Sequence, residues 1–191
     1  MAYSTIAQVK QQQYRNVWNQ AYAENPGVPL GLLEAIAYAK TRMKNIDPQQ
    51  ITHSCSGVPP PSGVMGLIDD GKGYFKNTTG LVASKSRFTK ASLGTNMSNT
   101  VLGYAEAFAR IQNELNITSN SPEANVPVLR YLSELPTQTA GQLFAQDAEI
   151  YQILKYLEDA DFMQSVYRSP HKINYSTVFG LNNFQILSSM K

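Results

Sequence analysis

Cys55, the single cysteine of the chain, lies two residues after His53 in a segment rich in proline and serine. A thiol beside an imidazole could act as a nucleophile with its general base, as in cysteine peptidases. In such enzymes the nucleophile and the base come from separate elements, and a third group orients the base. No such group stands out near Cys55, so the preferred interpretation is a free or packed thiol.

The two histidines, His53 and His171, lie far apart in the sequence. No His-Glu-x-x-His pair is present, so a metal site would need carboxylates to complete its ligand set. We therefore expect neither a metal ion nor another cofactor.

The composition is typical of one folded domain with an ordinary core. The chain has 191 residues, of which 42% are hydrophobic and 16% charged. Its net charge of +2 offers no basic stripe for nucleic acid. No run of eighteen apolar residues is present, so we expect no membrane span. The first ten residues lack the apolar centre of a signal peptide.

Apolar residues recur at helical spacing, which predicts a mostly α-helical protein with little or no sheet. The predicted helices cover residues 4–23, 30–43, 98–115, 122–134 and 139–158. The second is apolar on nearly every side, as is typical of a buried central helix. Ser98 is the predicted N-cap of the third.

Residues 45–97 are rich in proline, glycine and other turn-forming residues, which predicts a long irregular loop region. Its many aromatic residues favour a functional loop over a linker. Residues 1–165 are expected to form a single domain. Residues 166–191 show a weak strand-like alternation and are interpreted as a C-terminal strap, or as a linker to a possible further domain.

Four separated stretches carry a family resemblance: GVPLGLLEAIAYAKTRM (27–43), SGVMGLIDD (62–70), NTVLGYAEAFARIQ (99–112) and VPVLRYLSELP (126–136). In this order they resemble the lysozyme-like superfamily, in particular its lytic transglycosylases. They also resemble the domain that precedes the amidase module in some bacterial N-acetylmuramoyl-L-alanine amidases. The resemblance covers about residues 25–158. It implies a lysozyme-like helical fold and peptidoglycan glycan strands as the partner.

The resemblance also implies that the usual catalytic acid is absent. The family has a glutamate followed by a serine where this chain has Lys40 and Thr41. A carboxyl group in an apolar site can protonate the glycosidic oxygen and then act as a base. An ammonium group beside the developing oxocarbenium ion would oppose the transition state instead. The scaffold is therefore expected without its glutamate-dependent cleavage.

Three carboxylates are candidates for a displaced acid. Asp69 and Asp70 follow the Gly-Val-Met-Gly loop, which borders the groove in the family, although they also suit a solvated turn. Glu106 lies on a helix that faces the groove in the family, although it is also placed to pair with Arg110 at i,i+4. Glu34 is set aside, because six positions along a helix turn its side chain about 120° away from that of Lys40.

Candidate glycan contacts come from the resemblance and from aromatic residues that could stack on sugar rings. Aromatic faces stack on sugar rings, so Tyr74 and Phe75, in a glycine-flanked loop, are the favoured aromatic residues for ligand contact. The candidates are Lys40, Thr41, Met65, Tyr74, Phe75, Asn99 and Tyr131.

The preferred hypothesis is a bacterial lysozyme-like domain that binds or positions peptidoglycan glycan. It would belong to a larger wall hydrolase, such as an N-acetylmuramoyl-L-alanine amidase. The expected location is the cell envelope, meaning periplasmic, outer-surface or secreted, with the signal peptide missing from this chain. One alternative is an active lytic transglycosylase or muramidase that uses Asp69, Asp70 or Glu106. Another is a protein-interaction module, and the sequence leaves open whether the chain is an enzyme.

Overall fold

The computed structural model describes residues 14–50, 59–70 and 73–189, which are built from helices without a β-strand. Isolated bridges pair Ile46 with Gly63 and Ser62 with Leu67. The predicted all-helical class is therefore confirmed. None of the helices in these ranges is both long and apolar enough to cross a membrane.

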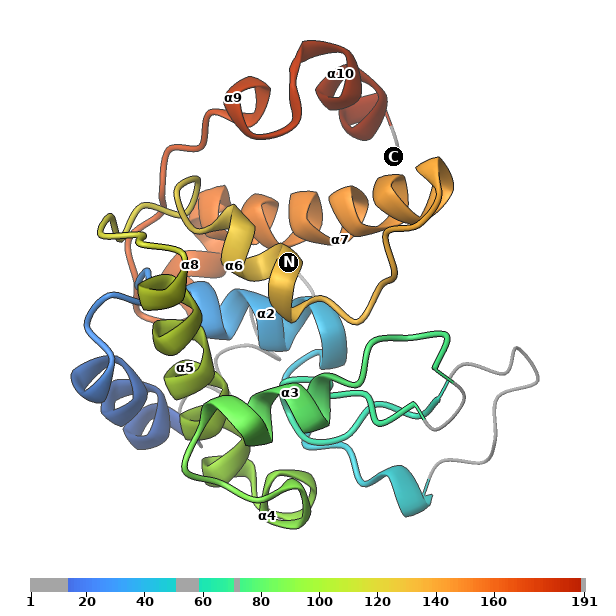
Figure 1. Cartoon of the computed structure of the whole chain (residues 1–191). Helices are drawn as coiled ribbons and strands as arrows, with labels where there is room; N and C mark the ends of the chain where they lie inside the picture. Colours follow the sequence, from blue (N-terminus) through green and yellow to red (C-terminus); the bar gives the residue numbers. More distant parts are fainter. Residues whose placement is uncertain (1–13, 51–58, 71–72, 190–191) are drawn as a thin grey trace.

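Helix α2 (Leu32–Thr41) is the buried centre of the fold, as predicted. Helix α7 (Ala140–Glu158) packs across it (Figure 1). The helix over residues 14–24 adds Trp18, which is fully buried. Residues 4–13 of the predicted first helix lie outside the described ranges. Five apolar residues of α2 have no exposed surface: Leu32, Leu33, Ala35, Ile36 and Ala37.

Helix α5 (Met97–Glu114) matches the predicted helix over 98–115, but its cap differs. The side chain of Asn96 accepts a hydrogen bond from the backbone N–H of Asn99 at 3.2 Å. Asn96 is therefore the N-cap, and Ser98 lies within the first turn. Fully buried Val101, Phe108 and Ile111 form the inner face of this helix.

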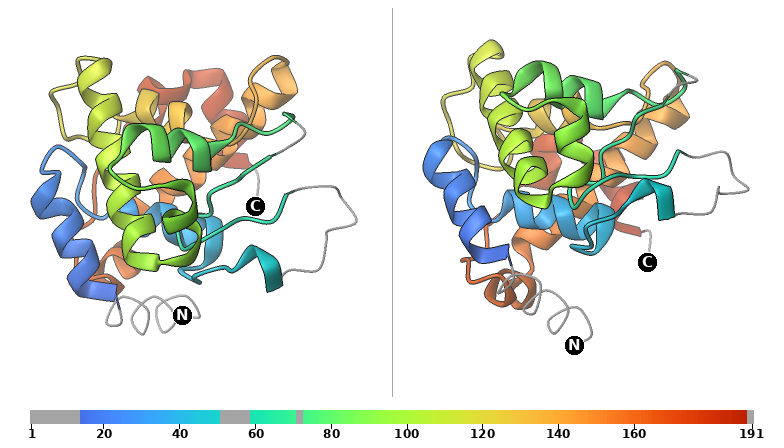
Figure 2. Two further views of the ribbon diagram at one scale, coloured as in Figure 1. Left: turned by 60° about the horizontal axis from the view of Figure 1, so that its bottom comes forward. Right: turned by 90° about the horizontal axis from the view of Figure 1, so that it is seen from below.

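The predicted irregular region over residues 45–97 is wrong in its second half. That half contains α3 (Thr78–Lys85) and α4 (Lys90–Thr95), and a 3₁₀ turn, η1 (Pro48–Gln50), lies earlier. Both helices pack against α5 (Figure 2). Each has one fully buried apolar residue, Val82 in α3 and Leu93 in α4. A single anchoring residue gives no helical period to detect.

The remaining predicted helices are present with shifted ends. Helix α6 (Val126–Leu132) is shorter than the predicted 122–134. Helix α7 begins after Thr139, which forms a capping box with Gln142. Helix α8 (Ala160–Ser165) follows directly.

The strand-like alternation in the C-terminal residues does not produce a strand. Helices α9 (Tyr175–Phe179) and α10 (Leu181–Ser189) form there, on the far side of α7 from α2 (Figure 1). The ring of Tyr151 on α7 contacts Tyr175 at 5.2 Å and Phe179 at 6.1 Å between ring centroids. Tyr175 and Phe179 are four residues apart, so they share one helical face.

A buried carboxyl group, that of Glu34, joins α2 to two neighbouring segments. Glu34 has no exposed surface and accepts hydrogen bonds from the Tyr22 hydroxyl and from Arg168 Nε, the latter at 3.3 Å. Burial raises the pKa of Glu34 above its ordinary value, against the opposing effects of Arg168 and the Tyr22 hydroxyl. The fold therefore depends on Arg168 to compensate this buried charge.

Replacing Arg168 by methionine should lower the free energy of unfolding by about 3 kcal/mol at pH 7, because Glu34 then keeps a buried charge without its cation. Urea unfolding followed by circular dichroism measures this. Arg110→Met is the matched control, since Arg110 lies 3.8 Å from Glu106 at the surface and should change stability by less than about 0.5 kcal/mol. Equal effects of the two substitutions would contradict the assignment.

Candidate functional site

The side chain of Lys40, in the last turn of α2, is neutralised by two carboxylates from other elements. Its Nζ donates to Glu134, which follows α6, and lies 2.7 Å from Glu149 on α7. The three side chains are 10%, 21% and 16% exposed, respectively. We call Lys40, Glu134 and Glu149 the Lys40 cluster.

The contacts within the Lys40 cluster favour the charged forms of Lys40 and Glu149. Burial acts to lower the pKa of Lys40, but the charges of Glu149 and Glu134 outweigh it and hold the pKa well above its ordinary value. Burial acts to raise the pKa of Glu149, yet the ammonium group of Lys40 lowers it below the usual range. The Ser133 hydroxyl supports this by donating to Glu149 at 2.6 Å. A carboxylate held ionised in this way cannot serve as a general acid.

The loop over residues 62–67 lies directly against the end of α2. Thr41 Oγ1 lies 2.7 Å from the carbonyl oxygen of Val64 and 2.8 Å from that of Ala37. Gly66 has a φ of +63°, and a Cβ atom there would lie 2.9 Å from the Cβ of Lys40. Glycine is therefore required both by the backbone conformation and by the space available.

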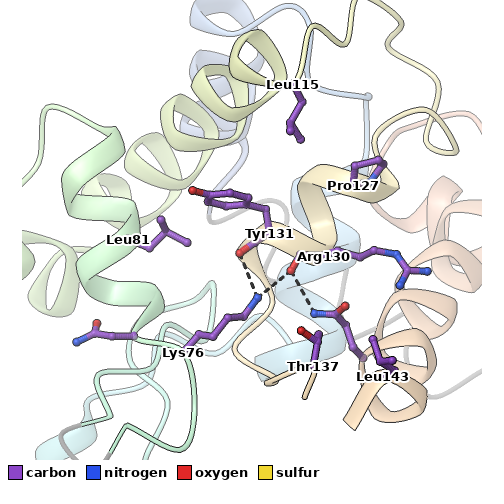
Figure 3. A pocket seen from close by; sticks show the side chains of 10 residues that line it. Lys76, Leu81, Leu115, Pro127, Arg130, Tyr131, Thr137 and Leu143 are labelled. Carbon is purple, nitrogen blue, oxygen red and sulfur yellow. Dashed lines mark hydrogen bonds between the residues drawn. The ribbon is translucent and has the colours of Figure 1, made fainter. Parts of the chain in front are cut away.

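A pocket of about 720 Å³ opens between α3, the end of α5, α6 and the start of α7 (Figure 3). The ring of Tyr131 on its wall is 42% exposed. Apolar and hydrogen-bonding side chains both line it, and none of them is a carboxylate. We call it the Tyr131 pocket; its lining is Lys76, Asn77, Leu81, Leu115, Pro127, Arg130, Tyr131, Thr137, Leu143 and Gln146.

Lys76 connects the Tyr131 pocket to the Lys40 cluster. Its backbone N–H donates to the carbonyl oxygen of Glu134 at 2.8 Å. Its Nζ donates to the carbonyl oxygens of Arg130 at 2.9 Å and Tyr131 at 3.3 Å (Figure 3). A cation suits these carbonyls because they form the negative end of α6. Burial lowers the pKa of Lys76, while Glu149 and Glu134 oppose that effect.

The structure brings together some of the predicted glycan contacts and separates others. Tyr131 lines the Tyr131 pocket. Tyr74 and Phe75 come directly before Lys76, another lining residue, and their ring centroids lie 4.8 Å apart. Tyr74 is 60% exposed. The remaining predicted contacts do not line the Tyr131 pocket: Lys40 is in the cluster, Thr41 and Met65 are buried, and Asn99 is half-buried on α5.

The three candidate acids have separate surroundings. Asp69 is 58% exposed and lies 3.8 Å from Lys90 Nζ. Asp70 is buried, and its Oδ2 accepts a hydrogen bond from the backbone N–H of Phe75 at 2.6 Å. Glu106 is paired with Arg110, as its spacing predicted. None of the three lines the Tyr131 pocket.

Sequence reasoning missed Glu134, Glu149 and Lys76. A lysine at the end of a buried apolar helix signals that counter-charges must exist, because a buried ammonium group needs partners. That signal does not say which of the acidic residues supply them.

Within residues 14–50, 59–70 and 73–189, no group of three or more histidine, cysteine, aspartate or glutamate residues could hold a metal ion. The ring of His171 lies 2.8 Å from the carbonyl oxygen of Leu30. His53 and Cys55 lie outside the described ranges.

Comparisons of the chain with protein-family models, with curated proteins and with solved structures give no match.

Lys40→Met should lower the free energy of unfolding by about 3 kcal/mol at pH 7, because two largely buried carboxylates lose their cation. The lowered pKa of Glu149 stabilises the fold above the ordinary carboxyl pKa of about 4.3, and this contribution is lost as the pH falls through the lower folded value. The raised pKa of Lys40 stabilises the fold at any pH below about 10.4. The deficit of the variant should therefore shrink between pH 7 and pH 3.

Urea unfolding at several pH values measures this deficit, and Lys44→Met, at an exposed position just after the end of α2, is the control. A deficit that stays constant down to pH 3 would show that the carboxylates do not carry the effect.

Gly66→Ala should destabilise the protein more than Gly73→Ala, by at least about 1 kcal/mol. Both glycines have positive φ, +63° and +72°, so both alanine variants share the backbone strain of about 1–2 kcal/mol. Gly66 alone of the two has a close neighbour, whereas a Cβ at Gly73 meets nothing within 4 Å. Thermal unfolding of the two variants distinguishes the cost of the contact with Lys40 from the cost of backbone strain. Equal melting temperatures would exclude a contribution from that contact.

Proposed function

We propose that this chain is a non-hydrolytic, lysozyme-like domain that binds the glycan strands of peptidoglycan. The Tyr131 pocket is the proposed binding site. The proposal combines the family resemblance of the four sequence stretches with the geometry of this pocket and of the Lys40 cluster.

The observation that carries the binding proposal is the exposed ring of Tyr131 on the wall of a pocket of about 720 Å³. Sugars present apolar C–H faces and many hydroxyl groups, so their sites combine an aromatic or aliphatic surface with hydrogen-bonding side chains. The pocket has both kinds of wall. Thr137 offers an uncharged hydroxyl group beside Tyr131. The other uncharged polar side chains of the lining, those of Asn77 and Gln146, already hold hydrogen bonds within the protein.

The Lys40 cluster supports the absence of cleavage. Where the resemblance places a catalytic acid, this chain has an ammonium group engaged by Glu134 and Glu149. Glu149 is held ionised, so it has no proton to give a glycosidic oxygen. The cluster suits a structural role beneath the binding site.

In this proposal the domain holds wall material for a catalytic module elsewhere in a longer wall hydrolase, such as an amidase, in the cell envelope. The support is the resemblance to domains that precede amidase modules. A binding domain of this kind raises the local concentration of substrate near a tethered catalytic site.

Incubation of the pure chain with insoluble peptidoglycan sacculi should place protein in the pellet and leave no soluble sugar products in the supernatant. Tyr131→Ala should weaken the binding about tenfold, which corresponds to about 1.4 kcal/mol from one aromatic contact. Tyr167→Ala is the matched control, because Tyr167 is 58% exposed and does not line the pocket.

Each other outcome points elsewhere. Soluble anhydro-muropeptides would mean an active transglycosylase, and Asp69→Asn, Asp70→Asn and Glu106→Gln would then identify its acid. Neither binding nor products would refute the proposal and leave a protein partner to be sought. Equal losses in the two tyrosine variants would remove the Tyr131 pocket as the site.

A further inference from the structure

The carboxylate of Asp147, on α7, contacts both the C-terminal helix α10 and the helix that carries Tyr131. Its Oδ2 accepts a hydrogen bond from the side-chain amide of Asn183 on α10 at 2.6 Å. Its Oδ1 lies 2.7 Å from a guanidinium nitrogen of Arg130 on α6. The Asp147 side chain is 12% exposed, so this carboxylate lies largely out of water. A single buried group therefore connects α10 to α6.

Arg130 belongs to the wall of the Tyr131 pocket and comes directly before Tyr131 in the sequence. Its carbonyl oxygen accepts hydrogen bonds from Lys76 Nζ at 2.9 Å and from Gln146 Nε2 at 3.2 Å (Figure 3). Gln146 lines the same pocket and is the residue before Asp147 on α7. A change in the pair formed by Asp147 and Arg130 therefore alters the pocket wall next to Tyr131.

Helix α10 is held against α7 by apolar contacts near its middle and its end. The ring of Phe184 lies 6.3 Å from the ring of Tyr151 on α7, measured between centroids, and Leu187 is fully buried. Leu181 and Ile186, in contrast, are more than half exposed. An isolated helix of nine residues is marginal in water, so α10 depends on these contacts for its helical form. We expect it to open at a lower free energy than the buried central helices.

We propose that α10 is a strap that sets the form of the Tyr131 pocket, with Asp147 as the positioning residue between them. While α10 is docked, Asn183 covers one carboxylate oxygen and keeps water from the pair of Asp147 and Arg130. An ion pair shielded from water is stronger than an exposed one. Release of α10 exposes this pair and weakens the contact that orients Arg130 beside Tyr131. Docked α10 therefore favours binding at the pocket, and released α10 disfavours it.

The effect on glycan binding rests on the proposed function, whereas the coupling between α10 and α6 does not. The coupling is measurable by NMR on the isotope-labelled full chain without ligand. Asn183→Ala should shift the backbone amides of Arg130 and Tyr131 on α6. Asn182→Ala, at the exposed neighbouring position, is the matched control and should leave both amides in place. Shifts confined to α7 and α10, or equal shifts in the two variants, would overturn the proposal.

Cosedimentation with peptidoglycan sacculi measures the consequence for binding. Asn183→Ala should weaken binding about threefold, which corresponds to about 0.7 kcal/mol, while Asn182→Ala should bind as the unaltered chain does. Added salt should weaken binding further in Asn183→Ala than in the unaltered chain, because salt screens an exposed ion pair more than a buried one. A loss of packing alone would not produce this difference in salt dependence.

A double-mutant cycle tests whether Asp147 is the link. Asp147→Asn removes the charge that holds Arg130 and should itself weaken binding. Asn183→Ala added to Asp147→Asn should then contribute less than half of its separate effect, because the two substitutions interrupt the same connection. Full additivity would mean that α10 acts on the pocket by another route, and would overturn the role of Asp147.

The two readouts separate this inference from the proposed function. If none of the chains binds sacculi, the proposed function fails, and the amide shifts of Arg130 and Tyr131 still decide the coupling. If the unaltered chain, Asn182→Ala and Asn183→Ala all bind sacculi equally, the inference fails and the proposed function stands.

Discussion

Helix α2 is apolar and buried along most of its length, yet it carries a charged side chain near each end. Each charge must meet an opposite charge from another part of the chain, because a lone buried ion is strongly destabilising. Arg168 meets Glu34 at the start of α2, and Glu134 and Glu149 meet Lys40 at its end. These two requirements restrict how the segment after α8, the end of α6 and the middle of α7 can be placed around the central helix.

The pocket at Tyr131 depends on the second of these requirements. Glu134 accepts from the Lys76 backbone while its carboxylate engages Lys40, so the segments around Lys76 and Glu134 are joined. Lys76 in turn holds two carbonyl oxygens of α6, the helix that presents Tyr131. Hydrogen bonds and ion pairs therefore fix the helix that carries the exposed Tyr131 ring, which favours a preformed Tyr131 pocket.

The sequence predicts those parts of the fold whose signal is local. The buried α2, the long α5 and the long α7 follow from apolar periodicity. Helices α3 and α4 escape prediction because one buried residue each, Val82 or Leu93, cannot establish a period. Tyr131 of the pocket and Lys40 of the cluster could be identified from their positions in the stretches 126–136 and 27–43. Glu134 and Glu149 were not, since pairing between residues about a hundred positions apart leaves no local pattern.

The Lys40 cluster also bears on how such a protein could change over evolutionary time. A lysine-to-glutamate change at position 40 alone would place three carboxylates where one cation now balances two. Like charges at such a spacing would repel one another or force protonation. The three positions are therefore epistatic: an acid becomes tolerable at position 40 only after Glu134 and Glu149 have been neutralised. Any exchange of lysine for an acid at position 40 would therefore require a change at the Glu134 and Glu149 positions as well.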